Sequence, residues 1–233
     1  MVPADPARLG VPRGVLAADA GSLAFVLGSG RGGMSLDFDG LARFQAAQGG
    51  RGGTAMVLGG DLEVLGSEQA RTAGFEGASV HADTLNDLHA DRLVVGARPT
   101  VIYGQQGRYV GFNEAMSNVK LRAGAVLKAP EVFLAGRGNL VVEAGAGIST
   151  LGQGAPIYDS SSGFVYQPGD SSLLAVSNGR LDVLAPAATG KGSILLGVCN
   201  TSSCSANSTF YSEGTMTAAT NRAFVLSEAS RYA

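Results

Sequence analysis

The sequence contains no tryptophan, and aromatic residues make up only 6% of its 233 positions. A compact domain of this length normally fills its centre with bulky aromatic side chains, whereas a narrow core can be filled by valine, leucine, isoleucine and alanine. Charged residues are also scarce, at 15%, and the formal net charge is −2. The chain therefore lacks the basic stripe of a nucleic-acid-binding protein and the polybasic patch of a membrane-surface protein.

Long apolar runs and a secretory leader are absent as well. Nowhere do 18 apolar residues follow one another, so no membrane span is predicted. Residues 1–20 lack the basic and the uninterrupted apolar regions of a signal peptide, and we expect them to form an irregular N-terminal segment. Two interpretations stay open at this point: a cytosolic protein, or an internal piece of a longer exported chain whose signal lies upstream.

Residues for catalysis and metal binding are few. His81 and His89 are the only histidines, and neither GxSxG nor HExxH occurs, so serine hydrolysis and zinc binding are not predicted. Asp83, Asp87 and Asp91 would share one face of a helical turn near His89, a set that could hold a divalent cation. A solvated polar face is the simpler interpretation. We therefore expect no catalytic residue, no cofactor and no metal.

A glycine motif at 28–33 has the spacing of a dinucleotide-binding fingerprint, Gly28-x-Gly30-x-x-Gly33, and an apolar strand is expected before it. Nucleotide binding also requires a helix after the glycines, whose N-terminus faces the pyrophosphate. Residues 34–39 instead alternate between apolar and polar, which is typical of a strand. The sequence therefore predicts a turn between strands at this position.

What the chain has in abundance is glycine, with 35 residues, and short apolar pairs between the glycines. The second half of 82–147 is clearest, where the pairs follow each other at steps of six, seven and eight residues. Each pair is typical of a short strand with alternate side chains in a core, and the steps are too short for a crossover helix. The pairs are Val119-x-Leu121, Ala125-x-Leu127, Val132-x-Leu134 and Leu140-x-Val142.

Three such strands would close one turn of a coil, and the pattern that begins at Asn118 returns at Asn139 after 21 residues. The sequence therefore predicts an all-β fold, a right-handed parallel β-helix (β-solenoid) of about ten coils of 20–23 residues. We expect a single such domain over 21–233, with a loop-rich insertion around 149–171. One face of successive coils would be Leu36, Leu58, Val80, Val101, Leu121, Val142, Phe164 and Leu184.

Strand alternation also assigns side chains to the two faces of these strands. Leu121, Leu134 and Val142 are predicted to point into the core. The charged neighbours are predicted to point outward, namely Lys120, Lys128 and Glu143.

Two motifs in 82–148 carry a resemblance to a known family. A segment of the form A..L..L.A..L..GG.R precedes strands of the form V.L..GA.L.APE..L.A...L.V..GA.I. In both, the chain resembles the repetitive passenger region of filamentous-haemagglutinin-type exoproteins, large adhesins exported by two-partner secretion. The matching residues are Ala82, Leu85, Leu88, Ala90, Leu93, Gly96, Arg98, Val119, Leu121, Gly124, Leu127, Ala129, Pro130, Glu131, Leu134, Leu140, Val142, Gly145 and Ile148.

The resemblance implies a structural or adhesive segment of a large secreted bacterial surface exoprotein, outside the cell or at its surface. The implied partners are a receptor or glycan on a host or neighbouring cell and, for the full-length protein, an outer-membrane barrel exporter. The family's secretion-domain signatures, NPNG and NSNL, are absent. We therefore expect an internal fragment of a longer exported chain, or a broken reading frame.

Cys199 and Cys204 are the only cysteines. The close pair fits a small disulfide-closed loop in an oxidising compartment, and reduced thiols in a cytosolic protein are the alternative. Given the resemblance to an exported protein, we expect the disulfide.

The main functional alternative is a polysaccharide lyase or glycosidase, because parallel β-helices often carry such activities. Their sites gather carboxylates or arginines on one outer face. The candidates in this chain are Asp37 with Asp39 and Arg92 with Arg98, and alternating surface residues explain these pairs more simply. We expect an adhesive segment rather than an enzyme.

Overall fold

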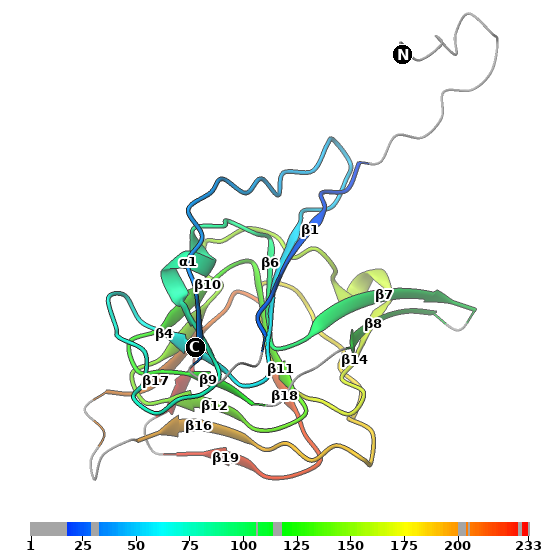
Figure 1. Ribbon diagram of the computed structural model, residues 1–233. Helices are drawn as coiled ribbons and strands as arrows, with labels where there is room; N and C mark the ends of the chain where they lie inside the picture. Colours follow the sequence, from blue (N-terminus) through cyan, green and yellow to red (C-terminus); the bar gives the residue numbers. More distant parts are fainter. Residues whose placement is uncertain are drawn as a thin grey trace, which may run out of the picture.

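The computed structural model describes residues 18–28, 33–105, 107–113, 118–199, 204, 206–227 and 230–232. Within these ranges the chain is mostly β-structure arranged in four sheets (Figure 1). The helical parts described are one turn of α-helix, α1 (Ala82–Asn86), and a short 3-10 helix, η2 (Ser160–Ser162). No helix in these ranges combines the length and the apolar character that a bilayer crossing requires.

A six-stranded mixed sheet lies between two hydrophobic cores. Its first four strands are parallel, whereas β15 runs antiparallel to both of its neighbours. In spatial order the strands are β1 (Ser22–Val26), β3 (Thr54–Leu58), β6 (Arg92–Val95), β11 (Glu131–Gly136), β15 (Ser172–Ser177) and β18 (Thr215–Ala219).

Burial on both faces explains why the inner strands of this sheet are continuous apolar runs. On β11, Val132 and Leu134 belong to the main core, while Phe133 and Ala135 belong to a second core on the opposite face. The alternation of side chains across a strand assigns consecutive residues to the two cores. A strand with apolar partners on both faces has no need of a polar face.

Two further sheets, both entirely parallel, supply the rest of the main core. The seven-stranded sheet has the order β19 (Phe224–Leu226), β16 (Ile194–Val198), β12 (Leu140–Glu143), β9 (Val119–Leu121), β4 (Leu62–Leu65), β5 (Ala78–His81) and β2 (Met34–Leu36). The four-stranded sheet has the order β10 (Val126–Lys128), β13 (Gly147–Ser149), β17 (Ser208–Tyr211) and β20 (Ser230–Tyr232).

The register between β9 and β12 is the one that the repeated asparagine pattern predicts. Val119 lies opposite Leu140, and Leu121 lies opposite Val142, in parallel. The two asparagines stack beside the strands, and the backbone amide of Asn139 donates to the side-chain Oδ1 of Asn118 at 2.7 Å. This pairing from the sequence is confirmed.

A three-stranded sheet packs on the outer face of the six-stranded sheet and encloses the second core. Phe112 of this sheet contacts Phe133 of β11, with ring centroids 5.4 Å apart. The hairpin of this sheet extends away from the other strands in Figure 1. Its strands are β14 (Phe164–Gln167), β8 (Gly107–Asn113) and β7 (Arg98–Gly104), with β7 and β8 antiparallel.

The prediction of a right-handed parallel β-helix of about ten coils is wrong. Two of the four sheets combine parallel and antiparallel strands, and the four sheets do not form a solenoid. Residues 98–113 fold back as a hairpin, and β15 enters the six-stranded sheet antiparallel to β11. Val101 and Phe164 therefore belong to strands of the three-stranded sheet, and Leu184, at 45% exposure, is a surface residue. Apolar alternation is the same in parallel and antiparallel strands, so the pattern did not fix strand direction.

We expected residues 1–20 to be irregular, and residues 1–17 of this segment lie outside the described residues. The segment that we expected to be a loop-rich insertion, 149–171, contains η2 and β14.

Candidate functional site

An ion pair lies in the second core. Arg92 and Glu131 are the first residues of β6 and β11 and lie directly opposite each other in the parallel register. Nε and Nη2 of Arg92 lie 2.9 and 2.7 Å from Oε2 of Glu131, and the two side chains are 1% and 0% exposed. Nη2 also donates to the hydroxyl of Tyr166 at 3.2 Å. Register places the opposite charges on neighbouring strands of one face, where they pair.

The electrostatics of this cluster follow from burial and pairing. Burial raises the pKa of Glu131, and the charge of Arg92 only partly offsets this effect. Burial alone would lower the pKa of Arg92, but the Glu131 carboxylate raises it overall, so the guanidinium stays charged. Burial is also the main reason that the pKa of Tyr166 lies well above its ordinary value. Tyr166 therefore remains a neutral hydroxyl that hydrogen-bonds to the ion pair.

A cavity of about 300 Å³ lies beside Arg92, between the first residues of β1, β3 and β6 and the start of the β7–β8 hairpin. We call it the arginine cavity. Its lining combines polar and apolar side chains in similar number. The polar ones are Asp19, Ser22, Arg51, Thr54 and Arg92, and the apolar or aromatic ones include Met56, Pro99, Val101, Ile157 and Tyr158.

Tyr158 contacts both arginines of this cavity. The guanidinium carbons of Arg51 and Arg92 are 5.1 and 4.8 Å from the centroid of its ring, which is the geometry of cation–π contacts. Arg51 is at the rim, with 38% of its side chain exposed, and its Nη1 is 3.7 Å from Oδ2 of Asp19. Each arginine of the cavity thus has its own carboxylate partner.

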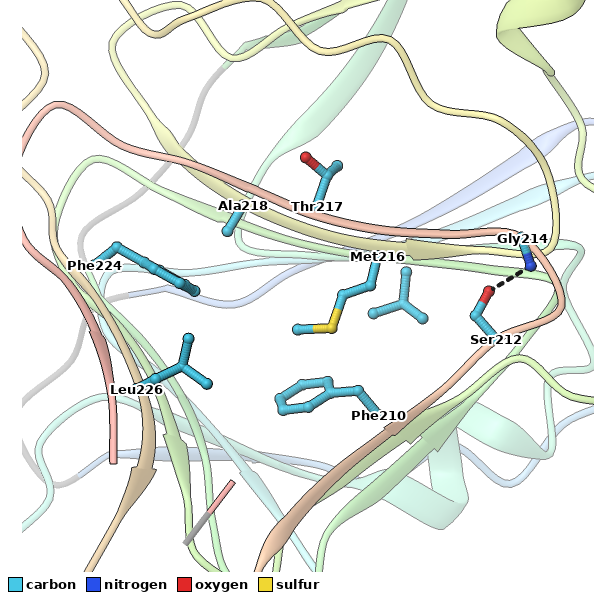
Figure 2. A pocket seen from close by; sticks show the side chains of 9 residues that line it. Phe210, Ser212, Gly214, Met216, Thr217, Ala218, Phe224 and Leu226 are labelled. Atoms are coloured by element: carbon cyan, nitrogen blue, oxygen red, sulfur yellow. Dashed lines mark hydrogen bonds between the residues drawn. The ribbon is translucent and has the colours of Figure 1, made fainter. Parts of the chain in front are cut away.

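A second hollow, of about 530 Å³, opens where β18 and β19 end their sheets. We call it the apolar end, formed chiefly by Phe210, Met216, Ala218, Phe224 and Leu226. Figure 2 shows the side chains of Phe210, Met216, Phe224 and Leu226 converging on the hollow, while Thr217 points away from it. Phe210 is part of the main core, and Met216 and Ala218 pack against that core. The hollow is therefore an opening of the main core to solvent.

The edges of the apolar end carry neither charge nor a strand partner in the part of the chain that the structure describes. The strands β18 (TMTAA) and β19 (FVL) contain no charged residue and are the outermost strands of their sheets. Phe224, Val225 and Leu226 are 46%, 44% and 42% exposed. Natural edge strands are usually protected by charges, proline or bulges, because an open apolar edge recruits further strands.

A second buried charge cluster joins three strands of the seven-stranded sheet. Arg122 follows β9 and contacts Glu63 of β4 at 2.8 Å and Glu143 of β12 at 2.7 Å. The prediction that Glu143 points outward is wrong: its side chain is 4% exposed and also accepts from the amide of Ala123. Glu143 lies on the face of β12 opposite Val142 and is buried there beside Arg122, while the register shift next to it comes from an extra residue, Gly197, in β16. Leu121, Leu134 and Val142 are fully buried, as predicted.

The acidic residues near α1 do not assemble into a metal site. Among the described residues no group of three or more histidine, cysteine, aspartate or glutamate side chains has metal-binding geometry. Asp83 accepts a hydrogen bond from Ser67, and Asp87 is the C-terminal cap of α1. In the glycine motif, Gly30 lies outside the described residues, and strand β2 follows Gly33, as predicted.

The residues considered for carbohydrate chemistry separate in the structure. Asp37 and Asp39 are exposed and line neither hollow, whereas Arg92 is buried and lines the arginine cavity. The sequence did not identify Glu131 and Tyr158 as the partners of Arg92. A signal existed for Glu131, because it and Arg92 are the charged first residues of two otherwise apolar strands.

Cys199 and Cys204 form a disulfide in the structure, with Cα atoms 5.4 Å apart. Cys199 directly follows β16. The oxidised state in solution stays a prediction, which thiol counting under denaturing, non-reducing conditions tests.

Comparisons of the chain with protein-family models, with curated proteins and with solved structures found no match. The resemblance to filamentous-haemagglutinin-type exoproteins therefore stays a prediction from the sequence.

Proposed function

We propose that this chain is a structural and adhesive segment of a large secreted bacterial surface exoprotein. Its location would be the cell surface or the extracellular space, as part of a longer exported chain. The sheets would hold exposed loops toward a receptor or glycan on a host or neighbouring cell. Export of the full-length protein would use an outer-membrane barrel.

The apolar end is the observation that carries the structural part of this proposal. Two uncharged edge strands, β18 and β19, border an opening of the main core, and three apolar residues of β19 are more than two-fifths exposed. A soluble monomer rarely leaves such a surface uncovered, and addition of a β-segment would supply both backbone partners and apolar contacts. In an exoprotein built from successive β-segments, a neighbouring segment would cover this end.

The direct test of the adhesive part is display of the chain on a non-adherent bacterium, followed by counting of cells attached to cultured epithelium. We expect attachment above that of the empty display system. Lys128→Gln, a change at an exposed position of β10, should preserve attachment. Leu134→Asp places an unpaired charge in the main core and should abolish it together with the fold. Attachment no greater than that of the empty system would contradict the proposal.

A carbohydrate-active enzyme is the second candidate, and the arginine cavity is the observation that favours it. Two arginines and Asp19 line that cavity, and Glu131, with its raised pKa, lies beside one of them. Incubation of the purified chain with a panel of polysaccharides separates the two functions. Release of new reducing ends or unsaturated products would favour the enzyme, and attachment without release would favour the adhesive segment.

A further inference from the structure

We propose that the arginine cavity binds one neutral sugar residue of a surface glycan. This inference rests on the proposed adhesive function and names the chemical class of its ligand. It is carried by the size of the cavity, by the balance of its charges and by the arrangement of its polar groups along three neighbouring strands.

The size of the cavity sets the size of the ligand. Its volume of about 300 Å³ lies at the lower limit for small-molecule sites, so it fits a single ring rather than an extended oligosaccharide. One part of the lining is apolar, formed by Met56, Pro99 and Val101. The C–H groups of a sugar ring would contact this part, while its hydroxyl groups would face the polar part.

The balance of charges argues against an anionic ligand. The charge of Arg92 is neutralised by Glu131 at 2.7 Å, and that of Arg51 is opposed by Asp19 at 3.7 Å. No unbalanced positive charge is left among these four groups to offset the desolvation of a carboxylate or phosphate. An entirely apolar ligand would instead desolvate the same polar groups without replacing their hydrogen bonds. A polyhydroxyl compound meets both conditions because each hydroxyl donates and accepts.

The polar groups are arranged in a row along the sheet. Ser22, Thr54 and Arg92 are the first residues of β1, β3 and β6 and are partners in the parallel register, so their side chains share one face. Neighbouring strands are about 4.8 Å apart, which is comparable to the distance between hydroxyl groups on opposite sides of a sugar ring. The hydrogen bonds described for Arg92 use its Nε and Nη2 atoms, and its side chain lines the cavity at the end of this row.

The test is titration of the purified chain with the methyl glycosides of galactose, glucose, mannose and N-acetylglucosamine, followed by NMR. Glucuronate and N-acetylneuraminate are the acidic comparison. We expect saturable binding of at least one neutral glycoside. Thr54→Val removes one hydroxyl at nearly constant shape, and binding should weaken roughly three- to tenfold, as for one lost hydrogen bond. Arg51→Met should weaken it about tenfold or more, because a charged donor is lost, and Lys128→Gln should leave it unchanged.

Binding of the acidic sugars alone, binding of no sugar, or equal binding by wild type and both cavity variants would overturn the proposal. Failure of sugar binding with attachment of the displayed chain retained would remove this inference and leave the adhesive function intact. If the folded wild-type chain shows no attachment above the empty display system, that result would instead contradict the adhesive function itself.

Discussion

At the scale of single residues, the two cores differ in polarity. The main core is apolar, whereas the second core includes the Arg92–Glu131 pair and the Tyr166 hydroxyl. A buried ion pair contributes little net stability, because desolvation of the charges offsets their attraction. Removal of one partner, however, leaves the other charge buried and alone. We therefore expect the pair to determine which strand starts lie side by side more than it stabilises the fold.

This view predicts strong coupling between the two residues. Arg92→Met and Glu131→Leu should each lower the free energy of unfolding by about 3–5 kcal/mol, since each leaves a buried charge unpaired. The double variant should lose much less than the sum of the two, because no charge remains. Urea unfolding of the four proteins measures the coupling. Additive losses would mean that the two side chains act independently.

Glu63 gives a pH-dependent prediction. Burial raises the pKa of Glu63, but hydrogen bonds from Thr72, Ser79 and Arg122 outweigh that effect and hold the pKa below its ordinary value. A carboxylate whose pKa is lower in the folded state stabilises the fold above its unfolded pKa of about 4.3, and this stability is lost as the pH falls through the folded pKa.

The stability difference between wild type and Glu63→Gln should therefore be constant from about pH 6 to 8 and shrink below about pH 4. Unfolding by urea at a series of pH values measures it. Glu76→Gln, at an exposed position, is the control and should leave the curve close to that of wild type. A difference that grows toward low pH would contradict the assigned direction of the shift.

At the scale of elements, the edges at the apolar end have no charged residue to prevent strand addition. Val225→Lys places a charge in the middle of edge strand β19 and should reduce association of the purified chain, with an unchanged circular dichroism spectrum. Sedimentation at increasing protein concentration measures the association. Leu41→Lys is the matched control, because Leu41 is also apolar and is 79% exposed, but lies outside the strands. Equal effects of both lysines would indicate a general solubility effect rather than a specific edge.

The sequence predicted local strand pairing better than strand direction. The register of β9 and β12 followed from the spacing of Asn118 and Asn139. Each asparagine directly precedes one of the two parallel strands, so aligning the asparagines aligns the strands. The antiparallel direction of β15 could not be predicted, since its apolar run SLLAVS is compatible with either strand direction. The burial of Glu143 was missed because its partner, Arg122, lies 21 residues away in the sequence.

The candidate sites were less predictable than the strands. Arg92 was expected to be an alternating surface residue but is buried, and its partners come from distant parts of the chain: Glu131 from β11 and Tyr166 from β14. The apolar end is formed by β17, β18 and β19, which only the folding of the sheets brings together. Both sites depend on tertiary arrangement, which local patterns do not encode.

At the scale of the whole molecule, four sheets enclose two hydrophobic cores, and the two hollows open at different places on this framework. Adhesion by such a framework would depend on many weak contacts made together. Repeated copies on one surface raise the effective concentration, so avidity can exceed the single-site affinity by about 10² to 10⁴. The number of copies on one surface, rather than one tight site, would then set the strength of attachment.

The measurement that tests this account most directly is the attachment of beads to epithelial cells as a function of the number of chains per bead. The account predicts little attachment at low density and a steep rise at high density, with Leu134→Asp beads inactive at every density and Lys128→Gln beads equal to wild type. Wild-type beads that stay unattached at every density, or attach no better than Leu134→Asp beads, would contradict it.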